Sequence, residues 1–453
     1  MSTNGLIGHR MMQMSRRGIL YGLLGTPAVV AACRRTGPPT AQQEEYVSAP
    51  LKGPVTLTYW DWAEVWRELI QSLVTRQQER RPGLTIDWQI VPDYWNKLQA
   101  AIAGGAAPDS WRMNGPNLPA WVSKGLLADL TPFFSRDKAA AADLQATALV
   151  FQEYTRRQGK QWSVPFGNAI SGILAYNVNM LQAEGLQPPA ELGERWRWPL
   201  LAEYAVKLTR ADGSRHGYHS ERGSETGWLP YLYANGGALF SEDGKRPVIN
   251  TPEARETFEY LVDFVLKLRA APTAQDLSAE NATQRFLTGK LAIIPRGSWE
   301  IKDLNRLVRD FTYDIVPIPR APRTGKNGST SQLASVVMNP ATRQQGEVWE
   351  WLRFIGSKEG QDIIARAEFF PARVESAETI YYDPKLGPAH RPLLREVLAV
   401  TKPLPYLDVG NWSQYGEVVN PLVTQMFNGQ TGVREALQKM QEDLSAAIER
   451  GLQ

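Results

Sequence analysis

Regular hydrophobic patterning begins at Val55 and predicts a strand–helix–strand unit. Residues 55–60 are rich in β-forming side chains, and residues 84–90 alternate apolar with polar positions, so both segments are expected to be strands. Between them, apolar residues recur at helical spacing until the Pro82-Gly83 break. This order of elements predicts a right-handed βαβ unit in a parallel sheet.

Strand and helix patterns alternate along the rest of the chain, which predicts an α/β fold. Further strands are expected near residue 111, over 291–295 and over 313–317. The expected helices cover 93–104, 118–124, 137–157, 177–184, 199–208, 228–235, a segment opening at Thr251-Pro252, 278–288, a segment around 348–355, and 433–444.

Residues 159–177 (GKQWSVPFGNAISGILAYN) hold two short apolar segments with an irregular junction between them. Pro165 lacks a ladder donor and Gly167 tolerates unusual dihedral angles, so one continuous strand is disfavoured. We interpret this stretch as a hinge that leaves one α/β lobe and enters a second; taken alone, it also fits an ordinary loop. Two further apolar crossings are expected at 291–299 and 329–339.

Three crossings would make each lobe discontinuous in sequence. Ligands of open α/β sheets bind outside the carboxyl ends of the strands, so a cleft is expected between the lobes. The predicted boundaries are a signal peptide (1–33), a flexible linker (34–53), an N-terminal lobe (54–170 plus 299–332) and a C-terminal lobe (171–298 plus 333–453).

The N-terminus carries an export pattern. Arg16-Arg17 precedes an uncharged run over 19–32, which is short for a membrane span but fits a signal-peptide core. The run ends at Ala31-Ala32-Cys33, a sequence like the bacterial lipobox. We expect cleavage before Cys33, lipidation of Cys33 and attachment to the outer face of the cell membrane, with the Sec and twin-arginine routes both open.

Composition excludes several classes of protein. Lys and Arg number 50 against 47 Asp and Glu, which gives no basic surface for nucleic acid. Cys33 is the only cysteine, so a disulfide framework and a thiolate-rich metal site are excluded. The close pair His216 and His219 is expected to face solvent rather than bind metal, and no cofactor is expected.

Several segments together resemble the solute-binding lipoproteins of bacterial ABC importers, in the sugar-binding family that includes maltose-binding proteins. They are VTLTYWDW, AAIAGGAAPDSW, WVSKGLLADLTPFF, WSVPFGNAISGILAYNVNML, YLYANGGALF, FLTGKLAIIPRGSWEI, WEWLRFIGSKEGQDI and FFPARVES. The resemblance implies a two-lobed periplasmic-binding-protein fold, type II-like, with hinge strands around a central cleft. It also implies a non-catalytic, membrane-anchored monomer that captures a sugar and delivers it to permease subunits with a separate ATPase.

A sugar presents an apolar C–H face and a rim of hydroxyls, which aromatic and polar side chains respectively can cover. The candidate ligand-binding residues are Trp60, Asp61, Trp62, Asp109, Trp111, Asn168, Trp228, Tyr231, Gly297, Trp299, Arg373 and Trp412. Asp61 also fits a helix cap, Asn168 a hinge-backbone partner and Trp62 a core residue; the family often has an acidic residue at the position of Asn168. Replacing Trp228 or Trp299 with alanine is expected to weaken binding by at least ~1 kcal/mol without unfolding.

Two alternatives remain from the sequence. A secreted glycoside hydrolase needs two carboxylates across a cleft, and Asp61 and Asp109 are available. The same clamp could instead hold a polyamine, a peptide or a phosphodiester. The 15 tryptophans, many near expected loop ends, favour a neutral sugar.

Overall fold

The computed structural model describes residues 48–405 and 412–450, which belong to one compact unit. The predicted signal peptide and Cys33 lie outside these residues, as does most of the predicted linker. The end of that linker is packed: Arg81 donates to the Ser48 hydroxyl and the Ala49 carbonyl, each at 2.7 Å, and Leu51 lies against the core. Residues 48–53 are therefore part of the folded unit, not a flexible tether.

The first sheet has six strands in the order β13-β6-β12-β3-β1-β2. Strand β1 pairs in parallel with β2 and β3, as the βαβ pattern predicts, and β12 is antiparallel to both β3 and β6. The strands are β1 (Val55–Asp61), β2 (Leu84–Ile90), β3 (Ser110–Asn114), β6 (Val164–Asn168), β12 (Ala334–Met338) and β13 (Phe370–Pro371).

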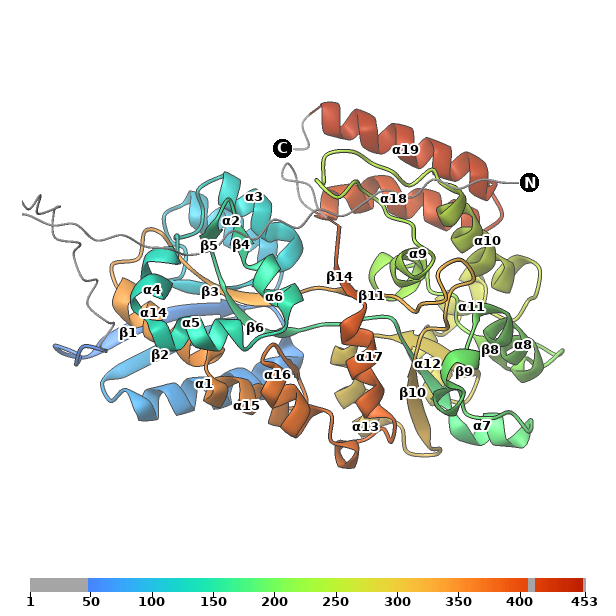
Figure 1. Cartoon of the computed structure of the whole chain (residues 1–453), viewed down its shortest axis with the longest axis horizontal. Coiled ribbons are helices and arrows are strands. Elements are labelled where there is room, and N and C mark those ends of the chain that lie inside the picture. The colour runs from blue at the N-terminus through green and yellow to red at the C-terminus, as the bar shows by residue number, and fades with distance from the viewer. Residues whose placement is uncertain (1–47, 406–411, 451–453) are drawn as a thin grey trace, which may run out of the picture. The chain divides into compact units, whose positions relative to one another are not determined.

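Helices cover both faces of this sheet because its strands are apolar on both sides. Leu57 and Tyr59 of β1 pack with α1 (Arg67–Arg80), α14 (Gln345–Gly356) and α15 (Lys358–Arg366). On the other face, Trp111 and Met113 of β3 pack with α2 (Tyr94–Ala103) and α3 (Leu118–Ser123). Helix α14 thus packs beside α1 on the same face of the sheet, although the two helices lie far apart in the sequence (Figure 1).

The predicted helix over 137–157 is wrong in its extent. Helix α5 (Lys138–Gln145) begins at Asp137, whose side chain accepts a hydrogen bond from the Ala140 amide, and α6 (Leu149–Tyr154) follows separately. Thr147 separates the two helices, because its backbone forms an isolated antiparallel β-bridge with Arg373. Helix α4 (Thr131–Arg136) and the short hairpin β4 (Arg156–Arg157) and β5 (Lys160–Gln161) complete this region.

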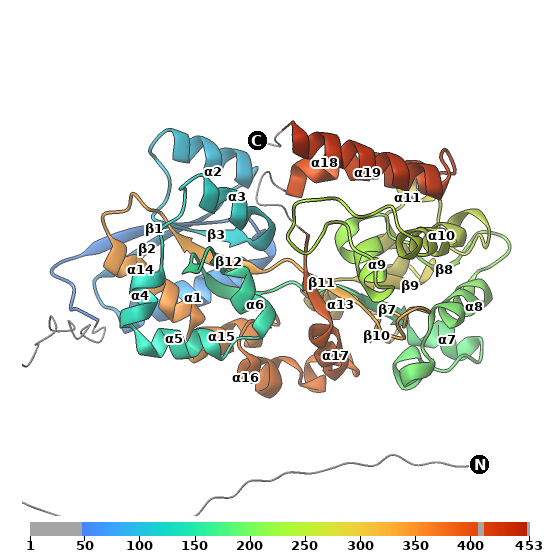
Figure 2. The ribbon, with the colours of Figure 1, turned by 45° about the horizontal axis from the view of Figure 1, so that its top comes forward.

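The second sheet has four strands in the order β10-β7-β9-β8. These strands are β7 (Ile173–Asn177), β8 (His216–Tyr218), β9 (Leu291–Arg296) and β10 (Tyr313–Pro317). Two apolar clusters flank the sheet, and Figure 2 shows its strands surrounded by helices of the same half. The helices of this half are α7 (Val178–Ala183), α8 (Trp198–Leu208), α9 (Leu229–Ala234), α10 (Pro252–Leu266), α11 (Ala274–Ala279), α12 (Ala282–Leu287), α13 (Ile301–Leu307), α17 (Leu394–Ala399), α18 (Trp412–Phe427) and α19 (Val433–Glu449). The short helix α16 (Val374–Ser376) packs against α15 of the first half.

The chain passes between the two sheets at two of the three crossings that the sequence predicted. The first passage runs from β6 to β7, and another runs from β10 through β11 (Ser329–Ser331) to β12. The expected crossing at 291–299 is wrong, because β9, α13 and β10 follow one another within the second half. After β13 the chain returns to the second half at α17, which packs on β10. Strand β14 (Thr401–Pro403) then pairs in parallel with β11 before α18 and α19 join the second core.

This pairing corrects the predicted lobe boundaries. Strand β10 lies in the segment 299–332 assigned to the N-terminal lobe, yet it pairs with β7 of the second sheet. Strand β12 opens the segment 333–453 assigned to the C-terminal lobe, yet it lies at the centre of the first sheet. Short apolar strands look alike in sequence, so pairing partners cannot be assigned from pattern alone.

Across residues 48–405 and 412–450, every helix is too short or too polar to cross a bilayer.

Candidate functional site

A cavity of about 250 Å³ lies where the first half, the second half and the passing segments meet. Its walls are rich in indole rings and also carry amide and carboxyl groups. The lining residues are Trp62, Ala63, Val65, Trp66, Asn114, Ala169, Glu225, Trp299, Gln332, Leu333, Ala334 and Phe369.

A second hollow, of about 560 Å³, continues from the first because Glu225 and Trp299 line both. This part is polar, and α18 contributes Asn420 and Thr424 to it. We call the two together the cleft. The remaining residues of the second hollow are Glu221, Arg222, Gly223, Ser224, Thr226, Arg296 and Glu300.

Trp62 and Trp66 form the aromatic wall of the first half. They follow β1 directly, and their rings meet edge to face with centroids 6.2 Å apart. The turn that aims them depends on Asp61, whose Oδ1 accepts hydrogen bonds from the Trp62 amide at 2.7 Å and the Ala63 amide at 3.2 Å. The sequence predicted Trp62 as a ligand-binding residue but did not single out Trp66.

Asp61 lies behind this wall rather than in it. Its carboxylate is fully buried and pairs with Arg112 Nη1 at 3.2 Å, and it also accepts from the Tyr59 hydroxyl at 3.1 Å. Asp61 therefore cannot contact a ligand in this structure, which corrects the predicted site. The alternative role of a helix cap is also wrong, because the amides that Asp61 binds, those of Trp62 and Ala63, precede the first helical turn, Glu64–Trp66.

Arg112 supports the aromatic wall from beneath. Its guanidinium carbon lies 3.4 Å from the centre of the Trp66 ring and 4.3 Å from that of Phe166. Burial lowers the pKa of the Arg112 guanidinium from its usual value, and the charge of Asp61 opposes that shift. The ion pair and the stacked rings thus hold Trp66 at the cavity.

Trp299 supplies an indole to the same cavity from the second half. It follows β9, and a Cβ built on Gly297 would lie only 2.1 Å from its ring, so the indole needs glycine beneath it. The Gly297 amide donates to Glu300 Oε2 at 2.9 Å, which fixes the turn. The sequence predicted both residues here; Gly297 lies under the indole rather than on the cavity wall.

Glu225 was missed by sequence reasoning. It lies in the turn Ser224–Trp228, and its Oε2 accepts from Gln332 Nε2 at 2.9 Å. Its backbone carbonyl accepts from the hydroxyls of Ser171 at 2.6 Å and Thr330 at 3.1 Å, which belong to the passing segments. Burial, with a smaller contribution from the nearby Glu300 carboxylate, raises the pKa of Glu225 to about 8.

Stability is expected to fall with rising pH because of Glu225. The folded protein binds its proton with a pKa of about 8 and the unfolded chain with the ordinary value of 4.5, so folding takes up a proton between these limits. The stabilising free energy that the protonation of Glu225 contributes to folding is complete below about pH 4.5 and is lost as pH rises through about 8. Denaturant unfolding of the wild type and Glu225→Gln from pH 5 to 8 should show the variant gaining relative stability; a constant difference would contradict the assignment.

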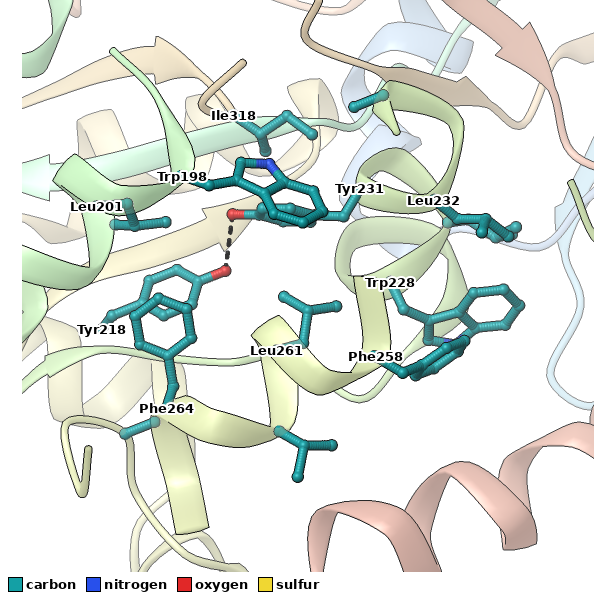
Figure 3. Packing of buried hydrophobic residues seen from close by; sticks show 14 of the residues in the cluster. Trp198, Leu201, Tyr218, Trp228, Tyr231, Leu232, Phe258, Leu261, Phe264 and Ile318 are labelled. Atoms are coloured by element: carbon teal, nitrogen blue, oxygen red, sulfur yellow. Dashed lines mark hydrogen bonds between the residues drawn. The ribbon is translucent and has the colours of Figure 1, made fainter. Parts of the chain in front are cut away.

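Three predicted aromatic residues lie in cores and not in the cleft. Trp228 is fully buried against Phe258 at 5.3 Å, and the Tyr231 hydroxyl bonds the Tyr218 hydroxyl at 2.9 Å (Figure 3). Trp111 is fully buried against Trp121. A tryptophan near a loop end can point inward or outward, and the sequence did not distinguish these directions.

Other predicted residues lie away from the cavity. Asp109 precedes β3 and accepts from the Thr58 amide at 2.9 Å, whereas the cavity lies at the opposite end of β3, at Asn114. Arg373 pairs with Asp143 of α5 at 2.7 Å. Trp60 is half-buried and packs on the α2 side of the first sheet.

The backbones of Asn168 in β6 and Trp412 in α18 are placed, but their side chains lie outside the described residues. Their predicted roles stay predictions.

The predicted solvent-facing histidine pair is also wrong. His216 and His219 are both buried; His216 Nδ1 lies 3.2 Å from an Arg285 nitrogen, and His219 Nε2 lies 3.1 Å from Glu221 Oε2. Within the described part of the chain, no three His, Cys, Asp or Glu side chains gather as a metal site would require.

Two α/β halves, passing strands and a cavity at their meeting point define the class of periplasmic-binding proteins. Residues 63–362 match the sequence profile of the family described as bacterial extracellular solute-binding protein, and the chain belongs to that family. A Brucella abortus protein named only as a binding protein is 22% identical over 339 residues, which cover 73% of this chain and 79% of the relative.

Solved structures agree on the fold. An ABC substrate-binding protein of Listeria monocytogenes, in complex with cycloalternan, has a TM-score of 0.77 and 21% identity, covering 87% of this chain and 99% of the other. The sugar-binding protein MalE of Xanthomonas citri has a TM-score of 0.74 and 16% identity, and the match covers 87% of this chain and 98% of MalE. The GacH receptor of Streptomyces glaucescens, solved with acarbose, has a TM-score of 0.73 and 21% identity, and the match covers 87% of this chain and 98% of the receptor. The maltose-binding-protein-like fold expected from the sequence is confirmed.

Proposed function

We propose that this protein captures a carbohydrate in the cleft and delivers it to the permease subunits of an ABC importer. The observation that carries the proposal is that indole rings from both halves, those of Trp62, Trp66 and Trp299, line one cavity. Amide groups of Asn114 and Gln332 lie among them. Indoles cover the C–H faces of sugar rings, and amides exchange hydrogen bonds with hydroxyls.

The length of the cleft favours a ligand of more than one sugar ring. The aromatic cavity opens into the larger polar hollow, and a further hollow along α18 shares Asn420 and Thr424 with it. Structural relatives with bound cycloalternan, acarbose or maltotriose agree with an oligosaccharide in a fold of this kind. We propose that ligand closes the two halves about the passing strands.

The alternatives fit the geometry less well. The family consists of non-catalytic binding proteins. Asp61 is buried in an ion pair and Asp109 lies at the far end of β3, so these carboxylates cannot flank a glycosidic bond in the cavity. A phosphodiester would place its negative charge beside the Glu225 carboxyl. A polyamine or a peptide backbone lacks the flat C–H face of a sugar ring, which is what indole rings cover.

Trp299→Ala is expected to weaken carbohydrate binding by at least ~1 kcal/mol, because it removes one of the three indole rings that line the cavity. A thermal-shift screen of oligosaccharides identifies the ligand, and calorimetry then measures both affinities. Trp88→Ala serves as the control, since Trp88 is half-buried on β2 and outside the cleft. If Trp299→Ala and Trp88→Ala bound equally well, the cavity would not be the site; a screen without any carbohydrate hit would overturn the function.

We also propose that the protein works as a lipid-anchored monomer outside the cytoplasm. The support is the export pattern that ends in Ala31-Ala32-Cys33. Several acyl chains, at about 0.8 kcal/mol per buried methylene, would hold the protein on the membrane. In cells fed a labelled fatty acid, Cys33→Ala should abolish labelling and release the protein from membranes; label retained on the variant would refute lipidation at this residue.

A further inference from the structure

The charged side chains of the cleft are not all compensated. Arg296 Nη1 pairs with Glu300 Oε1 at 3.3 Å. Glu221 accepts from the Gly223 amide at 2.9 Å and contacts His219. Glu225 differs, because among the described residues no Lys, Arg or His nitrogen lies within 4.0 Å of its carboxylate; its one side-chain partner is the neutral amide of Gln332.

The remaining cation of the cleft does not compensate Glu225. The Arg222 guanidinium lies 5.6 Å from the ring centre of Phe427, on the α18 side. Glu225 Oε1 is shielded from water and has no hydrogen-bond partner among the side chains that the structure describes. A carboxylate in such a place is costly unless a cation or a proton neutralises it.

The position of Glu225 makes a ligand the natural source of that cation. Glu225 lines both hollows and shares the smaller one with Trp62, Trp66 and Trp299. Rotation about its last side-chain torsion exchanges the two oxygens at little cost, so either can face the ligand. Indole faces also attract cations, by about 0.5–2 kcal/mol.

Resting on the carbohydrate-binding function, we propose that the cleft selects a sugar bearing a free amino group. The ammonium group pairs with the Glu225 carboxylate as a charge-assisted hydrogen bond, and the sugar rings lie between the indoles of Trp66 and Trp299. An acetylated amine or a hydroxyl at the same carbon carries no charge, so it cannot replace the proton on Glu225 and gains no charge-assisted hydrogen bond.

Binding should release a proton. With a pKa of about 8, Glu225 holds a proton at pH 7 in the free protein, and pairing with an ammonium returns it to the buffer. Two causes raise this pKa: the burial of the Glu225 carboxyl and the negative charge of the nearby Glu300. Arg296 partly neutralises Glu300, because the two side chains form an ion pair. Affinity for an amino sugar should therefore rise with pH between 6 and 7, where the sugar amine stays protonated.

The test compares matched sugars that differ at one carbon. Free-amino, N-acetyl and hydroxyl forms of gluco-, galacto- and manno-configured mono- and disaccharides are titrated into the wild type at pH 7 and low salt. For the preferred configuration, we expect the free-amino form to bind at least tenfold more tightly than its two partners. Calorimetry in buffers of different ionisation enthalpy should show release of about one proton for that form alone.

Glu225→Gln should reduce this tenfold preference to less than threefold, while Glu203→Gln, an exposed residue of α8 outside the cleft, should retain it. If neutral sugars bind and their free-amino forms bind no better, selection by Glu225 is wrong and the carbohydrate-binding function stands. If no sugar of any form binds, the function itself is wrong. The wild-type comparison decides the matter even if the variant does not fold.

Discussion

Asp61→Ala is expected to destabilise the folded protein by about 3–5 kcal/mol, because it leaves the Arg112 guanidinium charged, buried and without its counter-ion. The substitution also removes the acceptor for the amides of Trp62 and Ala63. The Tyr59 hydroxyl loses its partner as well. Each of these losses falls on the turn that carries the aromatic wall of the cleft.

Urea unfolding followed by circular dichroism measures this effect. Asp87→Ala is the matched control, since Asp87 is exposed on the neighbouring strand β2 and its loss should change stability by less than about 0.5 kcal/mol. Asp61→Leu combined with Arg112→Met should recover part of the loss, because no buried charge then remains unpaired. Equal stabilities for Asp61→Ala and Asp87→Ala would show that the pair is not buried in solution.

Trp228→Ala is also expected to cost about 3–5 kcal/mol of stability, because it opens a cavity in the core of the second half (Figure 3). The ring packs on Phe258 and has no exposed surface. The sequence predicted a loss of ligand affinity without unfolding at this position; the structure replaces that expectation with a loss of stability.

Trp299→Ala provides the comparison, since Trp299 is only partly buried and stands on the cavity wall. Thermal and urea unfolding of both variants should show a large loss for Trp228→Ala and a much smaller one for Trp299→Ala. Calorimetry with the identified ligand should show the reverse order for affinity. A stable Trp228→Ala protein with weakened binding would return Trp228 to the site.

Local pattern predicted the elements well where one segment decides its own structure. Alternation over β2 and the apolar face of α1 gave the first βαβ unit, and Pro165 with Gly167 marked the passage from β6 to β7. Partner choice was the weak point. Strand β9 and the passing segments share short apolar runs and Pro or Gly breaks, yet β9 stays within the second sheet because its partners are β7 and β8.

The site was predicted in kind but only partly in detail. Trp62 and Trp299 follow strand ends and do line the cleft, because short turns held by Asp61 and by Gly297 aim them there. Glu225 carries no sequence signal: it lies in an irregular turn and reaches the cavity through contacts with Ser171 and Thr330, distant in sequence. Such contacts depend on the tertiary fold.

The central place of β12 between β6 and β3 has a consequence for how the protein is made. A nascent chain that has emerged from the ribosome as far as β7 holds β1, β2 and β3 on one side and β6 on the other, with no strand to join them. The first sheet stays in two pieces until residue 338 has been synthesised, which is after all four strands of the second sheet, the last of them ending at Pro317. Chaperones that bind unpaired strand edges would meet this chain for most of its synthesis.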